Sequence, residues 1–159
     1  MISLRTSLAA AALGVTAIAT SAAADGTASV QTFYDLLSNP ASESHVAAFL
    51  EATSADWESI GDYSGETEGR DGFIGQMGFF AQLIPDLNWD VQAMHQDGDF
   101  VTVRSRATGT PTGPFFGVDG EGRSFDILTI DIHQLEDGVI VRSYHVEDWA
   151  SALQQLSGQ

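Results

Sequence analysis

Three side chains in the C-terminal third of the chain could together transfer protons. Asp131 and His133 are two residues apart in an apolar segment, and His145 lies in the apolar segment that follows. Residues two apart in a strand share a face, and a carboxylate beside imidazoles can take a proton next to a carbonyl group and return it elsewhere. The pattern therefore predicts a candidate catalytic site of Asp131, His133 and His145.

Whether these side chains meet depends on the turn between the two segments. A two-residue turn at 137–138 pairs His145 with Ile130 and leaves the histidine alone on an apolar face. A three-residue turn at 136–138 pairs it with Thr129 and brings the three candidate side chains together. The spacing leaves both registers open.

Two other interpretations of the same residues are considered. The carboxylate and the nearby histidine could face solvent or a partner subunit, while His145 is a hydrogen-bonded core residue. Aspartate and histidine are also metal-ligand types. We nevertheless predict no metal site and no cofactor.

Aromatic residues and one arginine are candidates for contact with a ligand, because ligand cavities are mainly apolar with a few polar groups. Two of the phenylalanines lie in a loop rich in Gly and Pro, where they could form a rim. The arginine could hold an anion, or it could pair with a surface acid. The predicted substrate-binding residues are Tyr34, Trp57, Phe80, Phe115, Phe116 and Arg104.

The N-terminus is typical of a signal peptide. Arg5 precedes an uncharged apolar run at 8–19, and three alanines at 22–24 end the segment before Asp25. The run is too short for a membrane span, which needs about 20 apolar residues. We therefore expect residues 1–24 to be a cleaved signal peptide and the protein to be periplasmic or secreted.

Composition limits the partners. The chain has 22 acidic residues against 6 basic ones, a net charge of -16, and it has no cysteine. Such a surface repels nucleic acid and anionic membranes, and disulfides are excluded. We expect a partner that is a small apolar molecule.

Periodicity predicts one α+β domain over residues 25–159, with helices first and strands after them. Residues 25–31 are expected to be a flexible start. Helices are predicted from 30 to 39, from 42 to about 50, over 72–83 and over 149–156. Strands are predicted at 57–63, 87–97, 100–103, 124–134 and 139–146, with turns at 97–98 and 136–138.

Several short motifs, in this order, resemble the SnoaL-like (ester cyclase) family, which shares a fold with nuclear transport factor two and ketosteroid isomerase. They are Gly-Arg-Asp-Gly at 69–72, Ile-Pro-Asp-Leu at 84–87, the Gln96–Asp99 turn before Val-x-Val-Arg, the Pro-Phe-Phe-Gly loop at 114–117, and Ser-Tyr-His-Val-Glu-Asp-Trp at 143–149. The resemblance covers nearly all of residues 25–159.

The resemblance implies a cone-shaped, curved antiparallel sheet packed against three N-terminal helices, and homodimers that pair through the sheet. Polyketide cyclases of this family close a ring by an aldol step without a cofactor. Their essential aspartate aligns with His145 and its histidine partner with Asp131, and this departure implies either an exchange of the two roles or a loss of the chemistry. We expect a cyclase or isomerase acting on an apolar carbonyl compound, with His145 as the base and Asp131 orienting it. The alternatives are a periplasmic module that binds a hydrophobic molecule, and a dimeric interaction domain.

Overall fold

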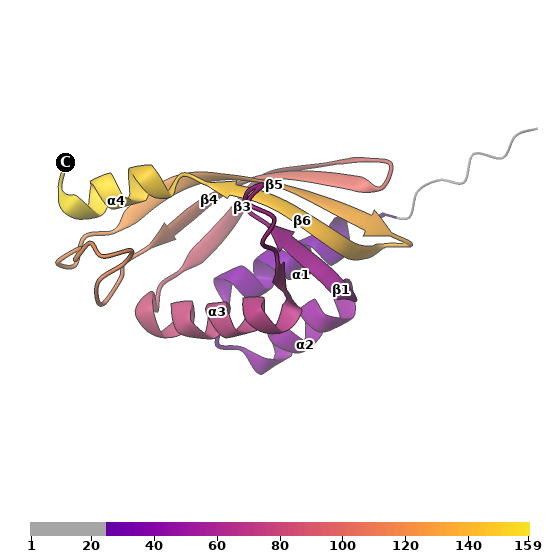
Figure 1. Cartoon of the computed structure of the whole chain (residues 1–159), viewed down its shortest axis with the longest axis horizontal. Coiled ribbons are helices and arrows are strands. Elements are labelled where there is room, and N and C mark those ends of the chain that lie inside the picture. The colour runs from indigo at the N-terminus through magenta and orange to yellow at the C-terminus, as the bar shows by residue number, and fades with distance from the viewer. Residues whose placement is uncertain (1–24) are drawn as a thin grey trace, which may run out of the picture.

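The computed structural model describes residues 25–159 (Figure 1). The expected signal peptide at 1–24 lies outside the described residues. The elements run in the order α1 (Thr27–Ser38), α2 (Glu43–Ala52), β1 (Thr53–Ile60), β2 (Glu68–Gly69), α3 (Arg70–Leu83), β3 (Asn88–Asp97), β4 (Phe100–Gly109), β5 (Phe125–Glu136), β6 (Val139–Glu147) and α4 (Trp149–Ser157).

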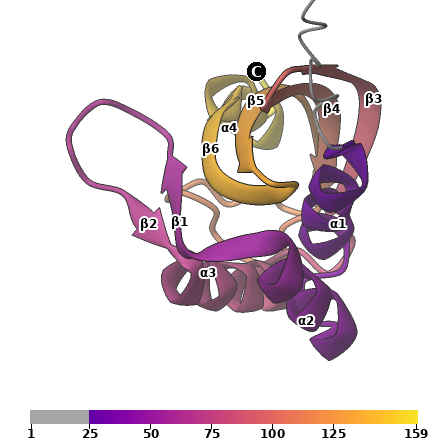
Figure 2. The ribbon, with the colours of Figure 1, turned by 90° about the vertical axis from the view of Figure 1, so that its right-hand side faces the viewer.

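The strands form one sheet in the order β2-β1-β6-β5-β4-β3. Helices α1, α2 and α3 lie on one side of it, and α4 continues from the end of β6 (Figure 1). Seen end-on, β5 and β6 curl strongly (Figure 2). The α+β prediction is confirmed, but the sheet is mixed: β1 is parallel to β6, whereas the prediction was antiparallel throughout. Only neighbours joined by a hairpin must be antiparallel, and β1 and β6 are far apart in the chain.

Helix α1 begins earlier than predicted. Residues 25–31 were expected to be flexible, but the helix starts at Thr27. Contacts from a distant strand and a distant turn hold this end: the Gly26 amide donates to Gln96 Oε1 (3.0 Å) and Ser29 Oγ donates to the Gly138 carbonyl (2.7 Å). Periodicity within the helix carries no information about these tertiary contacts.

The helices bury apolar faces against the sheet, as amphipathic helices do. Val30, Phe33 and Leu36 of α1 are buried, as are Phe49 of α2 and Phe73 of α3. Phe33 lies within 6.1 Å, between ring centroids, of the rings of Phe49, Phe73 and Trp57. This aromatic cluster fixes how the helices sit on the sheet. The cluster thereby covers the middle of β5 and β6 on the helix side of the sheet.

The β5–β6 hairpin combines a two-residue turn with a bulge, and neither predicted register occurs. Asp137 and Gly138 both have positive φ (51° and 83°), as a type I′ turn requires. The pairing then shifts by one residue between Leu135 opposite Ile140 and Gln134 opposite Arg142, so Val141 is the extra, bulged residue. The bulge moves His145 from its expected place opposite Ile130 to a place opposite Asp131.

The two faces of the sheet differ in character. On the side away from the helices, Leu128 is 53% exposed and Val146 is 59% exposed, and Phe100 and Ile132 are exposed as well. The helix side contains the buried polar residues of the middle strands. Large apolar residues on an open sheet face are a feature of interaction surfaces. No helix within 25–159 is long and apolar enough to cross a membrane.

Candidate functional site

A cavity of about 130 Å³ lies between the helices and the sheet. Its walls are mainly aromatic, and its ionisable groups come from one strand pair. Asp131 of β5 and His145 and Glu147 of β6 supply these groups, because alternation along each strand turns all three toward the helices. The remaining lining residues are Phe33, Leu37, Phe73, Gln76, Met77, Phe80, Trp89, Phe116 and Trp149.

Asp131 is a buried carboxylate, 3% exposed, directly opposite His145 in the strand register. The Tyr34 hydroxyl of α1 donates a hydrogen bond to its Oδ2 atom (2.8 Å). Burial raises the pKa of Asp131 from 3.8 to about 7, although the hydrogen bond from Tyr34 acts in the opposite direction. The Coulombic effect of Glu147 raises this pKa further, and that of His145 lowers it. Asp131 can therefore gain or lose a proton near neutral pH.

His145 is held by a carboxylate and a hydroxyl. Its Nδ1 atom lies 2.8 Å from Glu147 Oε1, and its Nε2 atom lies 3.0 Å from Ser59 Oγ of β1. The hydrogen bond with Glu147 raises the pKa of His145 despite the opposing effect of burial. Gly61 allows close approach of the ring: a Cβ atom there would lie 3.1 Å from His145 Cε1. The imidazole is thus fixed in place and favours its charged form.

His133 belongs to a second, fully buried set of hydrogen bonds. Its Nε2 atom lies 3.1 Å from the Tyr34 hydroxyl, and its Nδ1 atom lies 2.8 Å from Ser143 Oγ. The indole N–H of Trp57 donates to the same serine oxygen (3.1 Å). Burial lowers the pKa of His133 to about 3, so this ring is neutral at physiological pH. Burial also raises the pKa of Tyr34, with a further contribution from Asp131.

The predicted substrate-binding residues divide into three groups. Phe80 and Phe116 line the cavity. Tyr34 forms a hydrogen bond with Asp131, which lines the cavity, whereas Trp57 and Phe115 are almost fully buried in the core. Arg104 lies on the exposed, outer side of β4 and borders a hollow on that side, so it does not line the cavity.

Phe116 occupies an unusual position at the cavity mouth. It is 64% exposed and has φ 46°, within a tight turn closed by the Phe115–Val118 hydrogen bonds. Positive φ is rare for a bulky residue and costs free energy. The turn presents the ring toward Trp149, 6.2 Å away between centroids, at the edge of the cavity.

Sequence reasoning did not include Glu147, Ser59 and Ser143 in the site. A signal existed for Glu147, because it follows His145 by two residues and therefore shares its face in a strand. Ser143 precedes His145 by the same spacing. Nothing in the sequence pointed to Ser59, which reaches the histidine through the parallel pairing of β1 with β6.

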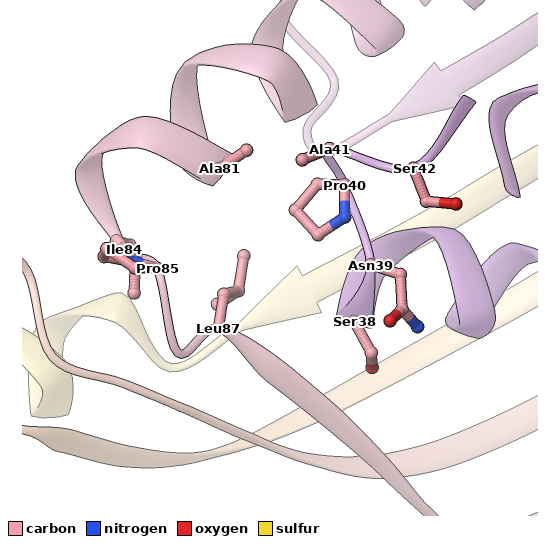
Figure 3. Close-up of a pocket in the computed structure, with 9 residues that line it drawn as sticks. All are labelled: Ser38, Asn39, Pro40, Ala41, Ser42, Ala81, Ile84, Pro85 and Leu87. Atoms are coloured by element: carbon pink, nitrogen blue, oxygen red, sulfur yellow. The ribbon is translucent and has the colours of Figure 1, made fainter.

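A larger hollow of about 360 Å³ lies elsewhere, between the α1–α2 turn and the end of α3 (Figure 3). It contains no ionisable side chain, so it is not the candidate site. Its lining residues are Ser38, Asn39, Pro40, Ala41, Ser42, Ala81, Ile84, Pro85 and Leu87. Within residues 25–159, no three His, Cys, Asp or Glu side chains are grouped so that they could hold a metal ion.

Comparisons with known proteins agree on the fold. IdmH from Streptomyces antibioticus, described as a candidate polyketide cyclase, is 26% identical with a TM-score of 0.71, covering 83% of this chain and 98% of its own. A candidate SnoaL-like polyketide cyclase from Jannaschia sp. CCS1 is 25% identical with a TM-score of 0.69, covering 84% and 94%. AclR from Streptomyces galilaeus, described as a candidate hydroxylase, is 18% identical with a TM-score of 0.70, covering 87% and 99%, and shows the fold alone.

No match to the chain was found among curated protein sequences. The family described as SnoaL-like polyketide cyclase matches residues 28–156. This match contains every strand of the sheet, including both strands that carry the ionisable groups of the cavity, and all but one terminal residue of α1 and of α4. The chain therefore belongs to the SnoaL-like polyketide cyclase family.

Proposed function

We propose that this protein is a cofactor-independent acid–base catalyst that acts on a small, neutral carbonyl compound. The observation that carries the proposal is the pairing of Asp131 and His145, which lie opposite each other on neighbouring strands and line one aromatic cavity. A proton donor and a proton acceptor at a shared, largely apolar cavity are what proton transfer next to a carbonyl group requires.

The two groups take the roles opposite to those expected from the sequence. His145 was expected to be the base, with Asp131 orienting it, but Glu147 and Ser59 hold both of its ring nitrogens. Its raised pKa makes His145 the acid. Asp131, with a pKa of about 7, is partly ionised at neutral pH and acts as the base. Its raised pKa brings its basicity close to the working pH, where general bases are most effective.

The reaction balances without another reagent. The C–H bond next to the carbonyl breaks, and Asp131 takes its proton while the bonding electrons move toward the carbonyl oxygen. His145 exchanges its Nε2 hydrogen bond with Ser59 for one to that oxygen and donates the proton, which forms an enol. The enol O–H then returns its proton to His145 as the carbonyl re-forms. Asp131 gives its proton either to a carbon at another position, which is an isomerisation, or to the oxygen of a second carbonyl group of the same molecule that the enol carbon attacks, which closes a ring.

The cavity favours small and uncharged substrates. About 130 Å³ is small beside the 300 Å³ or more that is typical of ligand pockets. The lining contains two carboxylic acids and no arginine, so an anionic group would enter an unfavourable potential. A cavity of this size fits a one-ring substrate, or a single ring of a larger molecule.

The test is exchange of α-protons in deuterium oxide, followed by NMR with acetylacetone, cyclohexanone and acetophenone as probes. We expect the wild-type protein to accelerate exchange of at least one probe. Asp131→Asn should reduce the acceleration by about 10²- to 10⁴-fold, the usual contribution of a general base. Asp56→Asn, which removes an exposed carboxylate of β1, is the matched control and should leave the rate unchanged.

A wild-type rate no faster than that of Asp131→Asn for all probes would contradict the proposal. Saturable binding of a probe by both proteins, without exchange, would instead indicate the alternative of a binding module for small apolar molecules. Calorimetry on the same two proteins separates these outcomes.

A further inference from the structure

The hydrogen bonds behind Asp131 have one consistent direction, set by the group at their far end. Trp57 contributes an indole N–H, which can only donate. It donates to Ser143 Oγ, and within residues 25–159 the other hydrogen-bond partner of that hydroxyl is His133 Nδ1. A buried hydroxyl proton needs an acceptor, so the serine O–H donates to Nδ1 of His133.

The direction continues through the histidine to the carboxylate. If Nδ1 of His133 accepts, the neutral ring carries its proton on Nε2 and donates it to the Tyr34 oxygen, 3.1 Å away. The Tyr34 proton then points to Asp131 Oδ2, 2.8 Å away. Each of the four donors has one acceptor, and the opposite direction would leave the buried Ser143 proton without one.

We propose that this one-directional relay of four buried side chains fixes Oδ2 of Asp131 as a hydrogen-bond acceptor and leaves Oδ1 as the oxygen that exchanges protons in the reaction. Tyr34, His133, Ser143 and Trp57 are thus positioning residues. The consequence for catalysis rests on the proposed function, whereas the relay itself can be measured without a substrate. Because an indole N–H does not accept a proton, the relay holds the carboxylate but cannot carry a proton away from it.

The location of the relay supports a positioning role. His133 is 0% exposed, and Tyr34, Trp57 and Ser143 are each 1% exposed, so no solvent molecule competes for these hydrogen bonds. The four side chains come from four different elements: α1 supplies the tyrosine, β1 the tryptophan, β5 the histidine and β6 the serine. The relay therefore ties Asp131 to the surrounding fold and not only to its own strand.

The test is the tautomer of His133, measured by long-range ¹H–¹⁵N NMR on the purified, ligand-free protein. We expect an Nε2–H tautomer, with Nδ1 showing the shift of an unprotonated nitrogen, throughout pH 5 to 8. An Nδ1–H tautomer at any pH in this range, or a charged ring, overturns the assignment. Ser143→Ala removes the donor to Nδ1 and should replace the single tautomer by a mixture.

Ser59→Ala is the matched control, since it removes a hydroxyl from the same face of the sheet that contacts His145 and not His133. It should leave the tautomer of His133 unchanged, and a mixture in this variant would overturn the specific role of Ser143. Tyr34→Phe should raise the pKa of Asp131, read from its side-chain ¹³C shift, because the ionised carboxylate loses a donor. An unchanged pKa would overturn the link to Oδ2.

These results are independent of activity. If no probe is exchanged but His133 has the expected tautomer, the relay stands and the proposed reaction fails. If exchange occurs and His133 carries its proton on Nδ1, the reaction stands and the relay is wrong. In an active protein, Tyr34→Phe should also move the acid limb of the pH–rate profile to higher pH, because the rate rises as Asp131 ionises.

Discussion

Asp131→Asn should make the protein more stable, and the gain should depend on pH. In the wild-type protein the carboxylic acid is buried, and ionising it costs free energy because burial disfavours the charged form. An asparagine has nearly the same shape, carries no charge and can still accept the hydrogen bond from Tyr34. The substitution therefore removes the cost of ionisation and keeps the packing.

The pKa values set the magnitude and the direction. The pKa of Asp131 rises from 3.8 to about 7 in the folded protein, which corresponds to roughly 4 kcal/mol at about 1.4 kcal/mol for each tenfold change in the ionisation constant. Because the folded-state pKa is the higher one, the folded protein binds the proton more tightly. The stability from this group is complete below pH 4 and is lost as the pH rises from about 4 to 7.

The assay is urea unfolding of both proteins at several pH values from 4 to 8. The difference in free energy of unfolding between Asp131→Asn and wild type should be below about 1 kcal/mol at pH 4 and should approach 4 kcal/mol at pH 8. A difference that stays constant over this range, or an Asn variant that is less stable at pH 8, would refute the reasoning about the buried carboxylate.

Three further perturbations test other parts of the site and surface. Gly61→Ala places a methyl group about 3.1 Å from His145 Cε1 and should reduce probe exchange by roughly 10- to 100-fold, with a changed ring shift for His145 in NMR spectra as the check. Phe116→Asn should allow exchange of larger ketones without loss of melting temperature, because relief of the positive φ, on the order of 1 kcal/mol, offsets the lost ring contacts. We also propose that two copies pair through the exposed outer face of the sheet, so Leu128→Glu should convert a dimer to a monomer in light scattering, and a monomeric wild type would contradict this.

Most helices and strands could be predicted because their signals are local, although the strand expected at 57–63 lies at Thr53–Ile60 and the short strand β2 was expected to be a loop. Ser42 accepts from the backbone N–H of His45 as the N-cap of α2, and Pro85 follows α3, whose last residue is Leu83. Alternation predicted strands at 124–134 and 139–146, within two residues of the observed bounds. The parallel pairing of β1 with β6 could not be read in this way, because it depends on contacts between segments far apart in the chain.

The candidate site was predicted in its residues but not in its geometry. The sequence singled out Asp131, His133 and His145, and the structure brings all three to one face of the sheet. The three side chains do not form one cluster, however. His133 forms hydrogen bonds with Tyr34 and Ser143, whereas His145 forms them with Glu147 and Ser59. Such partners depend on register and on helix packing, which alternation alone does not determine.

The proposed roles of Asp131 and His145 differ from the expected ones for a related reason. An unperturbed histidine is the natural base near neutral pH and an unperturbed aspartate is not. In the folded protein burial raises the pKa of Asp131 to about 7, and the hydrogen bond with Glu147 raises that of His145, so that the ring favours its charged form. Neither pKa shift can be assigned from the sequence, because each depends on how deeply the side chain is buried and on its partners in the fold.

The bulged residue Val141 suggests how chemistry could change within this fold during evolution. If Val141 were paired in the ladder and not bulged, Ser143, His145 and Glu147 would turn outward, and Arg142, Tyr144 and Val146 would turn toward the helices, without any substitution in β6. Loss of this bulge would exchange an acidic cavity for one with an arginine. A change of register in this hairpin is therefore a route to new reactions that comparison of aligned residues overlooks.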